Sequence, residues 1–184
     1  MFKTLLTGSA CLLIASPALA NPTLMGEVRI GDVRDNSIDS TEYTAEYWDT
    51  AKFANFGVEL QAKQLENEGS LDSTVSVKAG PILPNVYGIT PVAYVEAGRV
   101  FNPGDSFNFW GAGAKASKAV YGPVSIAIGY RHREGFSSNV MNEDRVNGGI
   151  SLALKNNYVL GAQYYRTRGT TDSDAVGLSV VRKF

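Results

Sequence analysis

The chain has 184 residues and carries 17 lysines and arginines against 18 acidic residues, which gives a formal net charge of −1. This balance excludes the strongly basic pattern of nucleic-acid-binding proteins, and the length suits one domain. The single cysteine, Cys11, falls in the expected leader. The mature chain is therefore predicted to form no disulfide and to carry no thiol chemistry.

Residues 1–20 have the pattern of a secretory signal peptide. Lys3 supplies a positive start, a short apolar run follows, and Ala18-Leu19-Ala20 forms an A-x-A cleavage site. We expect cleavage near Ala20 and a mature domain over residues 21–184. No later stretch reaches the ~18 apolar residues that a membrane-spanning helix needs. The periplasm or the outer membrane is the expected destination.

Most of the mature chain alternates between apolar and polar side chains, which predicts β-strands. In the first segment, Leu24, Val28 and Ile30 alternate with Glu27 and Arg29. Polar or Pro/Gly-containing stretches separate the successive segments. The expected strands are residues 23–33, 41–49, 56–63, 74–79, 89–101, 107–119, 124–131, 146–154, 158–165 and 175–184.

The connections between these segments alternate in character. Polar loops, the longest expected at 134–144, interleave with shorter turns such as Lys155-Asn156-Asn157. An even number of strands joined in this way predicts an all-β fold, a closed antiparallel up-and-down transmembrane β-barrel of ten strands. Eight strands is the alternative, if residues 41–63 pair less regularly.

Aromatic residues are predicted to form two belts, as interfacial burial of amphipathic rings would produce. The belt near the turns and the chain end would contain Tyr47, Trp48, Phe53, Phe56, Tyr87, Tyr121, Tyr158 and Phe184. The belt near the loops would contain Tyr43, Phe101, Phe107, Tyr130 and Tyr164.

Residues 175–184, A-V-G-L-S-V-V-R-K-F, alternate strictly and end on Phe184. They resemble the last strand of small Gram-negative outer-membrane β-barrel proteins, although Arg182 stands where an apolar residue is usual. The resemblance implies an outer-membrane location, contact with lipid and lipopolysaccharide, and recognition of Phe184 by the barrel assembly machinery. The alternative is a soluble periplasmic sandwich or lipocalin-like barrel, whose apolar register would face inward.

In a membrane barrel the polar register faces the lumen. Two functions follow from a charged lumen. One is a porin-like passive channel for small polar solutes or ions. The other is a non-conducting surface barrel, filled by ion pairs, whose loops at 31–40 and 134–144 bind partners or stabilise the outer membrane. The candidate lumen-lining residues are Glu27, Arg29, Glu46, Glu59, Lys63, Lys78, Glu96, Lys115, Arg131, Arg133 and Arg145.

The segment G-Y-R-H-R at residues 129–133, with the closing R-K-F, is loosely similar to the oligogalacturonate-type small porins. Those porins are longer, and the similarity implies a small anionic solute. Catalysis, a cofactor and a metal site are not expected. The only histidine, His132, is predicted to point outward at the rim, away from any lumenal partner that acid–base chemistry would need.

Overall fold

The computed structural model describes residues 22–33, 38–65, 71–137, 141–170 and 172–184. The predicted signal peptide lies outside these residues, so its cleavage stays a prediction. No helix in the described part of the chain is long and apolar enough to cross a membrane.

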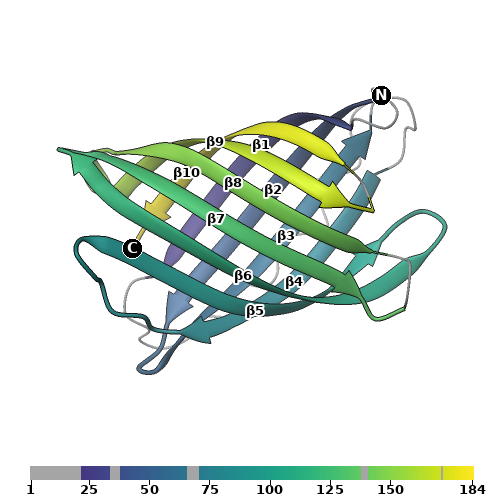
Figure 1. Cartoon of the computed structure of the whole chain (residues 1–184), viewed down its shortest axis with the longest axis horizontal. Helices are drawn as coiled ribbons and strands as arrows, with labels where there is room; N and C mark the ends of the chain where they lie inside the picture. Colours follow the sequence, from purple (N-terminus) through teal and green to yellow (C-terminus); the bar gives the residue numbers. More distant parts are fainter. Residues whose placement is uncertain (1–21, 34–37, 66–70, 138–140, 171) are drawn as a thin grey trace.

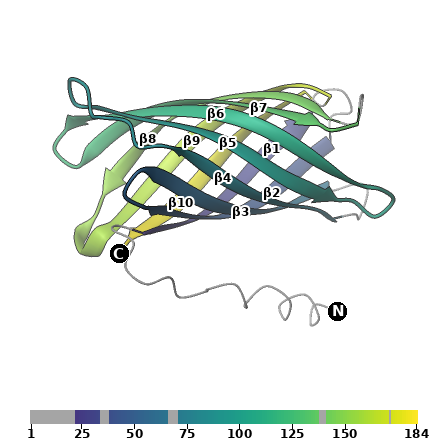
Figure 2. The same ribbon diagram turned by 90° about the horizontal axis from the view of Figure 1, so that it is seen from below.

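The chain forms one closed barrel of ten antiparallel strands, each paired with its neighbours in sequence and the last paired with the first (Figures 1 and 2). The predicted ten-stranded fold is confirmed. The strands are β1 (Thr23–Val33), β2 (Ile38–Thr50), β3 (Ala54–Leu65), β4 (Leu71–Pro81), β5 (Ile89–Phe101), β6 (Ser106–Tyr121), β7 (Val124–Gly135), β8 (Asn142–Ala153), β9 (Tyr158–Gly169) and β10 (Ser173–Lys183).

The eight-stranded alternative is wrong because β2 and β3 pair without interruption, from Ser40 opposite Leu65 to Thr50 opposite Asn55. The expected turn between β8 and β9 is also present, as a short 3-10 helix over Lys155–Asn157. Its two asparagines have positive φ angles, which asparagine tolerates better than most residues.

Several predicted loops are shorter than expected. The long loop expected at 134–144 is reduced to residues 136–141, because β7 continues to Gly135 and β8 begins at Asn142, with Glu134 opposite Asn142. Residues 138–140 of that loop, and residues 34–37 of the loop at 31–40, lie outside the described residues. The expected contrast between long loops and short turns also fails at residues 82–88, a long connection on the side predicted to carry turns.

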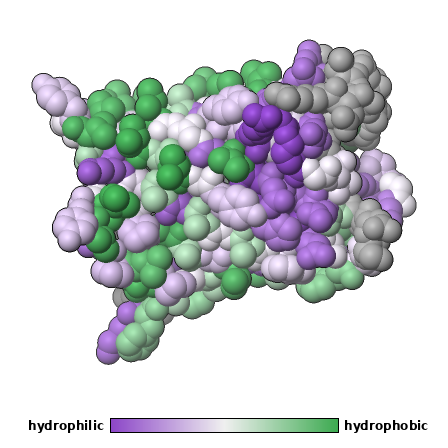
Figure 3. All heavy atoms as spheres, in the orientation of Figure 1, coloured by the Kyte–Doolittle hydropathy of each residue, from purple (hydrophilic) through white to green (hydrophobic). Residues whose placement is uncertain are grey.

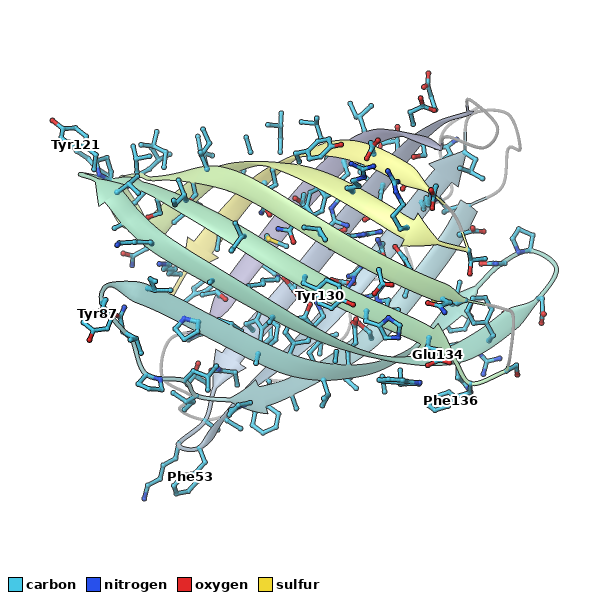
Figure 4. The ribbon with its side chains drawn as sticks, in the orientation of Figure 1. Phe53, Tyr87, Tyr121, Tyr130, Glu134 and Phe136 are labelled. Atoms are coloured by element: carbon cyan, nitrogen blue, oxygen red, sulfur yellow. The ribbon has the colours of Figure 1, made fainter. Side chains whose placement is uncertain are left out.

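We call the end of the barrel that carries the connections after β2, β4, β6 and β8, with Phe184, the turn end. The opposite end is the loop end. In Figure 1 the turn end lies at the left. Phe53, Tyr87 and Tyr121 project from it, whereas Glu134 and Phe136 lie toward the loop end (Figure 4).

The apolar register faces outward. Ile126 and Ile128 on β7 are 46% and 68% exposed, and the same side of every strand carries exposed Val, Leu, Ile or aromatic side chains. On the face shown in Figure 3, hydrophobic residues gather toward the turn end and hydrophilic residues toward the loop end. This outward apolar surface is what a membrane barrel presents to lipid, and the inverse of a soluble barrel.

Most predicted belt aromatics are on the outer surface, but two are not. Trp48 follows the inward register of Glu46 and packs edge-on against Tyr94, with ring centroids 5.7 Å apart. Phe107 lines a cavity inside the loop end. Strand parity, which alternates strictly, places both rings inside whatever their height along the barrel.

Candidate functional site

The barrel interior is made of charged side chains. The charged side chains that are almost completely shielded from solvent lie on six of the ten strands. The buried charged side chains include Glu27, Arg29, Glu42, Glu46, Glu59, Lys78, Glu96, Arg131 and Arg133. Buried charges are costly unless they are paired, so the arrangement of the pairs determines what the interior can do.

The first group of paired charges, which we call the Arg131 cluster, converges on the carboxylate of Glu59 on β3. Lys78 Nζ lies 2.8 Å, Arg133 Nη2 2.7 Å and Arg131 Nη1 3.4 Å from its oxygens. Glu96 is held by Arg133, whose Nε lies 2.9 Å away. The cluster consists of Glu46, Glu59, Glu96, Lys78, Lys115, Arg131 and Arg133.

These contacts cross the lumen. In the closed strand order, β3 and β7 are separated by β4, β5 and β6 on one side of the barrel. The bonds from Arg131 and Arg133 on β7 to Glu59 on β3 therefore join opposite walls. The interior at this height is filled by side chains that hold one another across the barrel.

Aromatic rings and glycines fit around this cluster. The guanidinium of Arg133 lies 4.7 Å from the centre of the Phe109 ring, and Lys78 lies 5.2 Å from that of Tyr94, both within reach of a cation–π contact. Gly113 on β6 makes room for Tyr94, because an added Cβ would stand 2.4 Å from the phenol oxygen.

The second group, the Glu42 cluster, lies toward the loop end. Glu42 accepts a hydrogen bond from Arg29 and lies 3.5 Å from Arg145 Nη1. Arg145 also binds Glu143 at 2.9 Å, and Arg29 binds Glu27, at 2.5 Å from Nη2 to the carboxylate. The Glu42 cluster consists of Glu27, Arg29, Glu42, Glu143 and Arg145.

Tyr165 on β9 completes the Glu42 cluster. Its hydroxyl donates a hydrogen bond of 2.5 Å to Glu27, and the Arg29 guanidinium stacks 4.3 Å above its ring. Arg145 lies 6.0 Å from the centre of the same ring. The phenol and the two arginines thus form a compact layer across the interior.

Two cavities lie on either side of this layer. The outer one, about 230 Å³, lies toward the loop end and is lined by Lys63, Asp72 and Phe107 among others. The inner one, about 110 Å³, is lined by Glu46, Lys115 and Gln163 among others. Among the described residues, only Arg29, Arg145 and Tyr165 line both cavities. We call these three residues the septum.

The predicted lumen-lining residues do not all occupy equivalent places. Nine of the eleven belong to the Arg131 or Glu42 clusters and are deeply enclosed. Lys115 is the exception within the clusters, because its side chain is 42% exposed and its nearest ion-pair contact, to Glu46, is 3.7 Å. Lys63 lines the outer cavity and belongs to neither cluster.

Several interior residues were absent from the predicted set. Glu42 has the parity of Thr44 and Glu46, so alternation alone was sufficient to find it. Glu143 was assigned to a loop, which the longer β8 corrects. Tyr165 and Phe109 have the inward parity too, but the predicted set contained only charged residues.

His132 lies on the outer face, as predicted. Its Nδ1 is 3.0 Å from Asp144 Oδ1, and its ring packs edge-on against Trp110 at 5.7 Å. The Tyr130 hydroxyl donates to the same carboxylate. This group faces away from the charged interior, and no set of three or more His, Cys, Asp or Glu in the described ranges could hold a metal ion.

No protein-family model and no curated protein matches this sequence. Solved outer-membrane structures do resemble its fold. A bacterial polysaccharide outer-membrane secretin aligns with a TM-score of 0.53 at 9% identity, over 88% of this chain and 65% of that one. The translocator domain of the autotransporter NalP from Neisseria meningitidis aligns at 0.48 and 9% identity, over 94% and 91% of the two chains.

The KdgM porin in complex with disordered oligogalacturonate aligns with a TM-score of 0.47 at 7% identity, over 90% of this chain and 99% of that one. At these identities the likeness is one of fold. The chain has the closed β-barrel architecture of outer-membrane proteins.

Proposed function

We propose that the protein is a porin-like channel of the Gram-negative outer membrane for small polar solutes or ions, closed by its septum in the conformation described above. The outward apolar surface supports the membrane location. The observation that supports the channel is that two polar cavities lie in succession inside the barrel and share Arg29, Arg145 and Tyr165 as lining residues. Rotation of these side chains would join the cavities without moving any strand.

The second candidate is a non-conducting surface barrel. It is favoured by the bonds from β7 to β3, which join opposite walls of the lumen at mid-height. Breaking one partner of a buried ion pair costs about 3–5 kcal/mol, so openings that require these bonds to break would be rare. The shortness of the connections gives this candidate little loop surface with which to bind a partner.

Single-channel recording in planar bilayers tests the two candidates. We expect brief, small current steps from the wild type, and longer openings after Tyr165→Ala, which removes the ring that separates the cavities. Tyr164→Ala is the matched control, since that ring is 49% exposed on the outer surface. Silence from the wild type and from a correctly folded Tyr165→Ala variant would leave the non-conducting barrel.

The membrane partners are proposals as well. Arg166 is exposed on the outer register of β9 beside Tyr164, a position that supports contact with lipopolysaccharide phosphates. Phe184 is 56% exposed, and Arg182 lies over its ring at 4.6 Å. This exposed terminal ring supports recognition by the assembly machinery.

A further inference from the structure

The two charged clusters are unequally balanced. In the Arg131 cluster, four cations face three carboxylates, which leaves one excess positive charge. In the Glu42 cluster, two arginines face three carboxylates, which leaves one excess negative charge. The charges of the two clusters therefore cancel as a whole, but the Arg131 cluster, most of whose residues line the inner cavity, is positive.

Arg131 is the less tightly paired of the two arginines in the Arg131 cluster. Arg133 holds Glu59 and Glu96 at 2.7 and 2.9 Å, whereas Arg131 reaches the same two carboxylates only at 3.4 and 4.0 Å. The Nη2 of Arg131 is buried and has no hydrogen-bond partner among the described residues. The side chain is only 9% exposed. A buried, unpaired guanidinium nitrogen is costly unless something outside the protein satisfies it.

Arg131 faces the inner cavity together with Lys115, whose side chain is 42% exposed and whose ion-pair contact with Glu46 is 3.7 Å long. Five basic side chains line this cavity, against the carboxylates of Glu46 and Glu59. The basic residues are Arg29, Lys78, Lys115, Arg131 and Arg145. The cavity volume of about 110 Å³ is sufficient for a small anion with several waters.

We propose that the inner cavity binds one small monovalent anion, of the size of chloride, between Arg131 and Lys115. The single charge follows from the single excess cation of the Arg131 cluster. The anion accepts from Arg131 Nη2 and neutralises the cluster. The site does not depend on the proposed channel activity, because the anion can reach it through the solvent that wets Lys115, without crossing the septum.

The test measures the chloride-35 NMR linewidth of the refolded protein in detergent, with sodium gluconate keeping the ionic strength constant. Binding at a slowly tumbling site broadens the chloride signal. We expect broadening with the wild type and its loss in Arg131→Gln. Arg166→Gln, which removes an exposed cation from the outer surface, is the matched control and is expected to retain the broadening.

Arg131→Gln is expected to fold, because Arg133 already occupies both carboxylates and the variant cluster is neutral. Should it not fold, Lys115→Gln removes the second, more exposed ligand and is expected to reduce the broadening at least severalfold. Equal broadening by the wild type and either folded lumenal variant would overturn the site. So would a wild type without broadening, in which case water alone satisfies Arg131. A protein that binds chloride but stays silent in bilayers would keep the site and overturn the channel.

Discussion

At the scale of single residues, Glu59 is the point on which the cations of three different positions converge. It accepts from Lys78 on the neighbouring strand and from Arg131 and Arg133 on the opposite wall. A carboxylate in this setting does more than neutralise one partner. Its removal would leave two walls of the barrel with cations that face each other without a shared counterion.

We therefore predict that Glu59→Gln lowers the free energy of unfolding by about 3 kcal/mol, the lower end of what loss of one buried ion-pair partner costs. Glutamine keeps the shape and one acceptor oxygen, so the effect reports the charge. The measurement is urea unfolding of the refolded protein in lipid vesicles, followed by gel mobility. Glu134→Gln, at an exposed glutamate on the outer face, is expected to change the value by less than about 0.5 kcal/mol. Equal free energies of unfolding for the two variants would mean that the charge of Glu59 does not stabilise the barrel.

Sequence reasoning reached the charged residues of the interior better than the aromatic ones. Side-chain parity along a strand is a local property, so Glu27, Lys78 and Arg133 were assignable from their neighbours alone. Which of these charges meet is not local. The bond between Glu59 and Arg133 joins residues far apart in the chain, and only closure of the barrel brings their strands opposite each other.

Aromatic side chains show the limit of the same reasoning. Rings are expected in the interfacial belts of a membrane barrel, and this expectation misplaced Trp48, whose parity with Glu46 puts it inside. Tyr165 on β9 has the inward parity too, yet its role depends on its contacts with Arg29 and Glu27 on β1. Composition predicts that such residues lie in an interfacial belt, whereas the strand register determines whether each ring points to the lumen or to the outer surface.

At the scale of the elements, each strand has one lipid-like face and one polar face. The ends of strands were predictable where turn residues interrupt the alternating pattern, as Gly122-Pro123 does between β6 and β7. They were not predictable where polar residues continue the ladder, as at Glu134, because an exposed polar strand and a polar loop have the same composition. The hydrogen bonds from the partner strand extend β7 and β8 beyond their apolar segments.

The outward face of β7 provides a direct test of the membrane orientation. We predict that Ile128→Arg lowers the stability of the protein in lipid vesicles by about 2–4 kcal/mol, the cost of an arginine near the bilayer midplane. The same change at Phe53, 79% exposed at the turn end, is expected to cost at most about 1 kcal/mol, because charged side chains near the interface remain hydrated. Urea titration of both variants by tryptophan fluorescence gives the comparison. If both changes are neutral, the outer surface of the barrel faces water.

At the scale of the whole molecule, the barrel combines a closed wall with a closed interior. Pairing of β1 with β10 over the full length of β1 leaves no strand edge in the described sheet, which is what permits a β-structure to stand in a bilayer. The charged side chains of the interior need partners, as the backbone groups of the wall do. They must be paired with one another, or with a bound ion, because the wall excludes other partners.

The even strand number puts the start of β1 and the end of β10 side by side at the turn end, with Thr23 opposite Lys183. In the proposed outer-membrane orientation this end faces the periplasm and the loop end faces outward. Because the predicted mature chain contains no cysteine, single cysteines introduced at either end can report this orientation without background.

We predict that Phe136→Cys, 68% exposed toward the loop end, reacts with a membrane-impermeant maleimide on intact Gram-negative cells that express the protein. Tyr121→Cys, 84% exposed at the turn end, is expected to react only after the outer membrane is permeabilised. The measurement is the labelled fraction of each variant before and after permeabilisation, with both shown to be folded by heat-modifiable gel mobility. The reverse pattern would invert the barrel. If neither cysteine is labelled on intact cells and both react once the membrane is permeabilised, the loop end is not at the cell surface, and the interior ion pairs belong to a barrel with a different location.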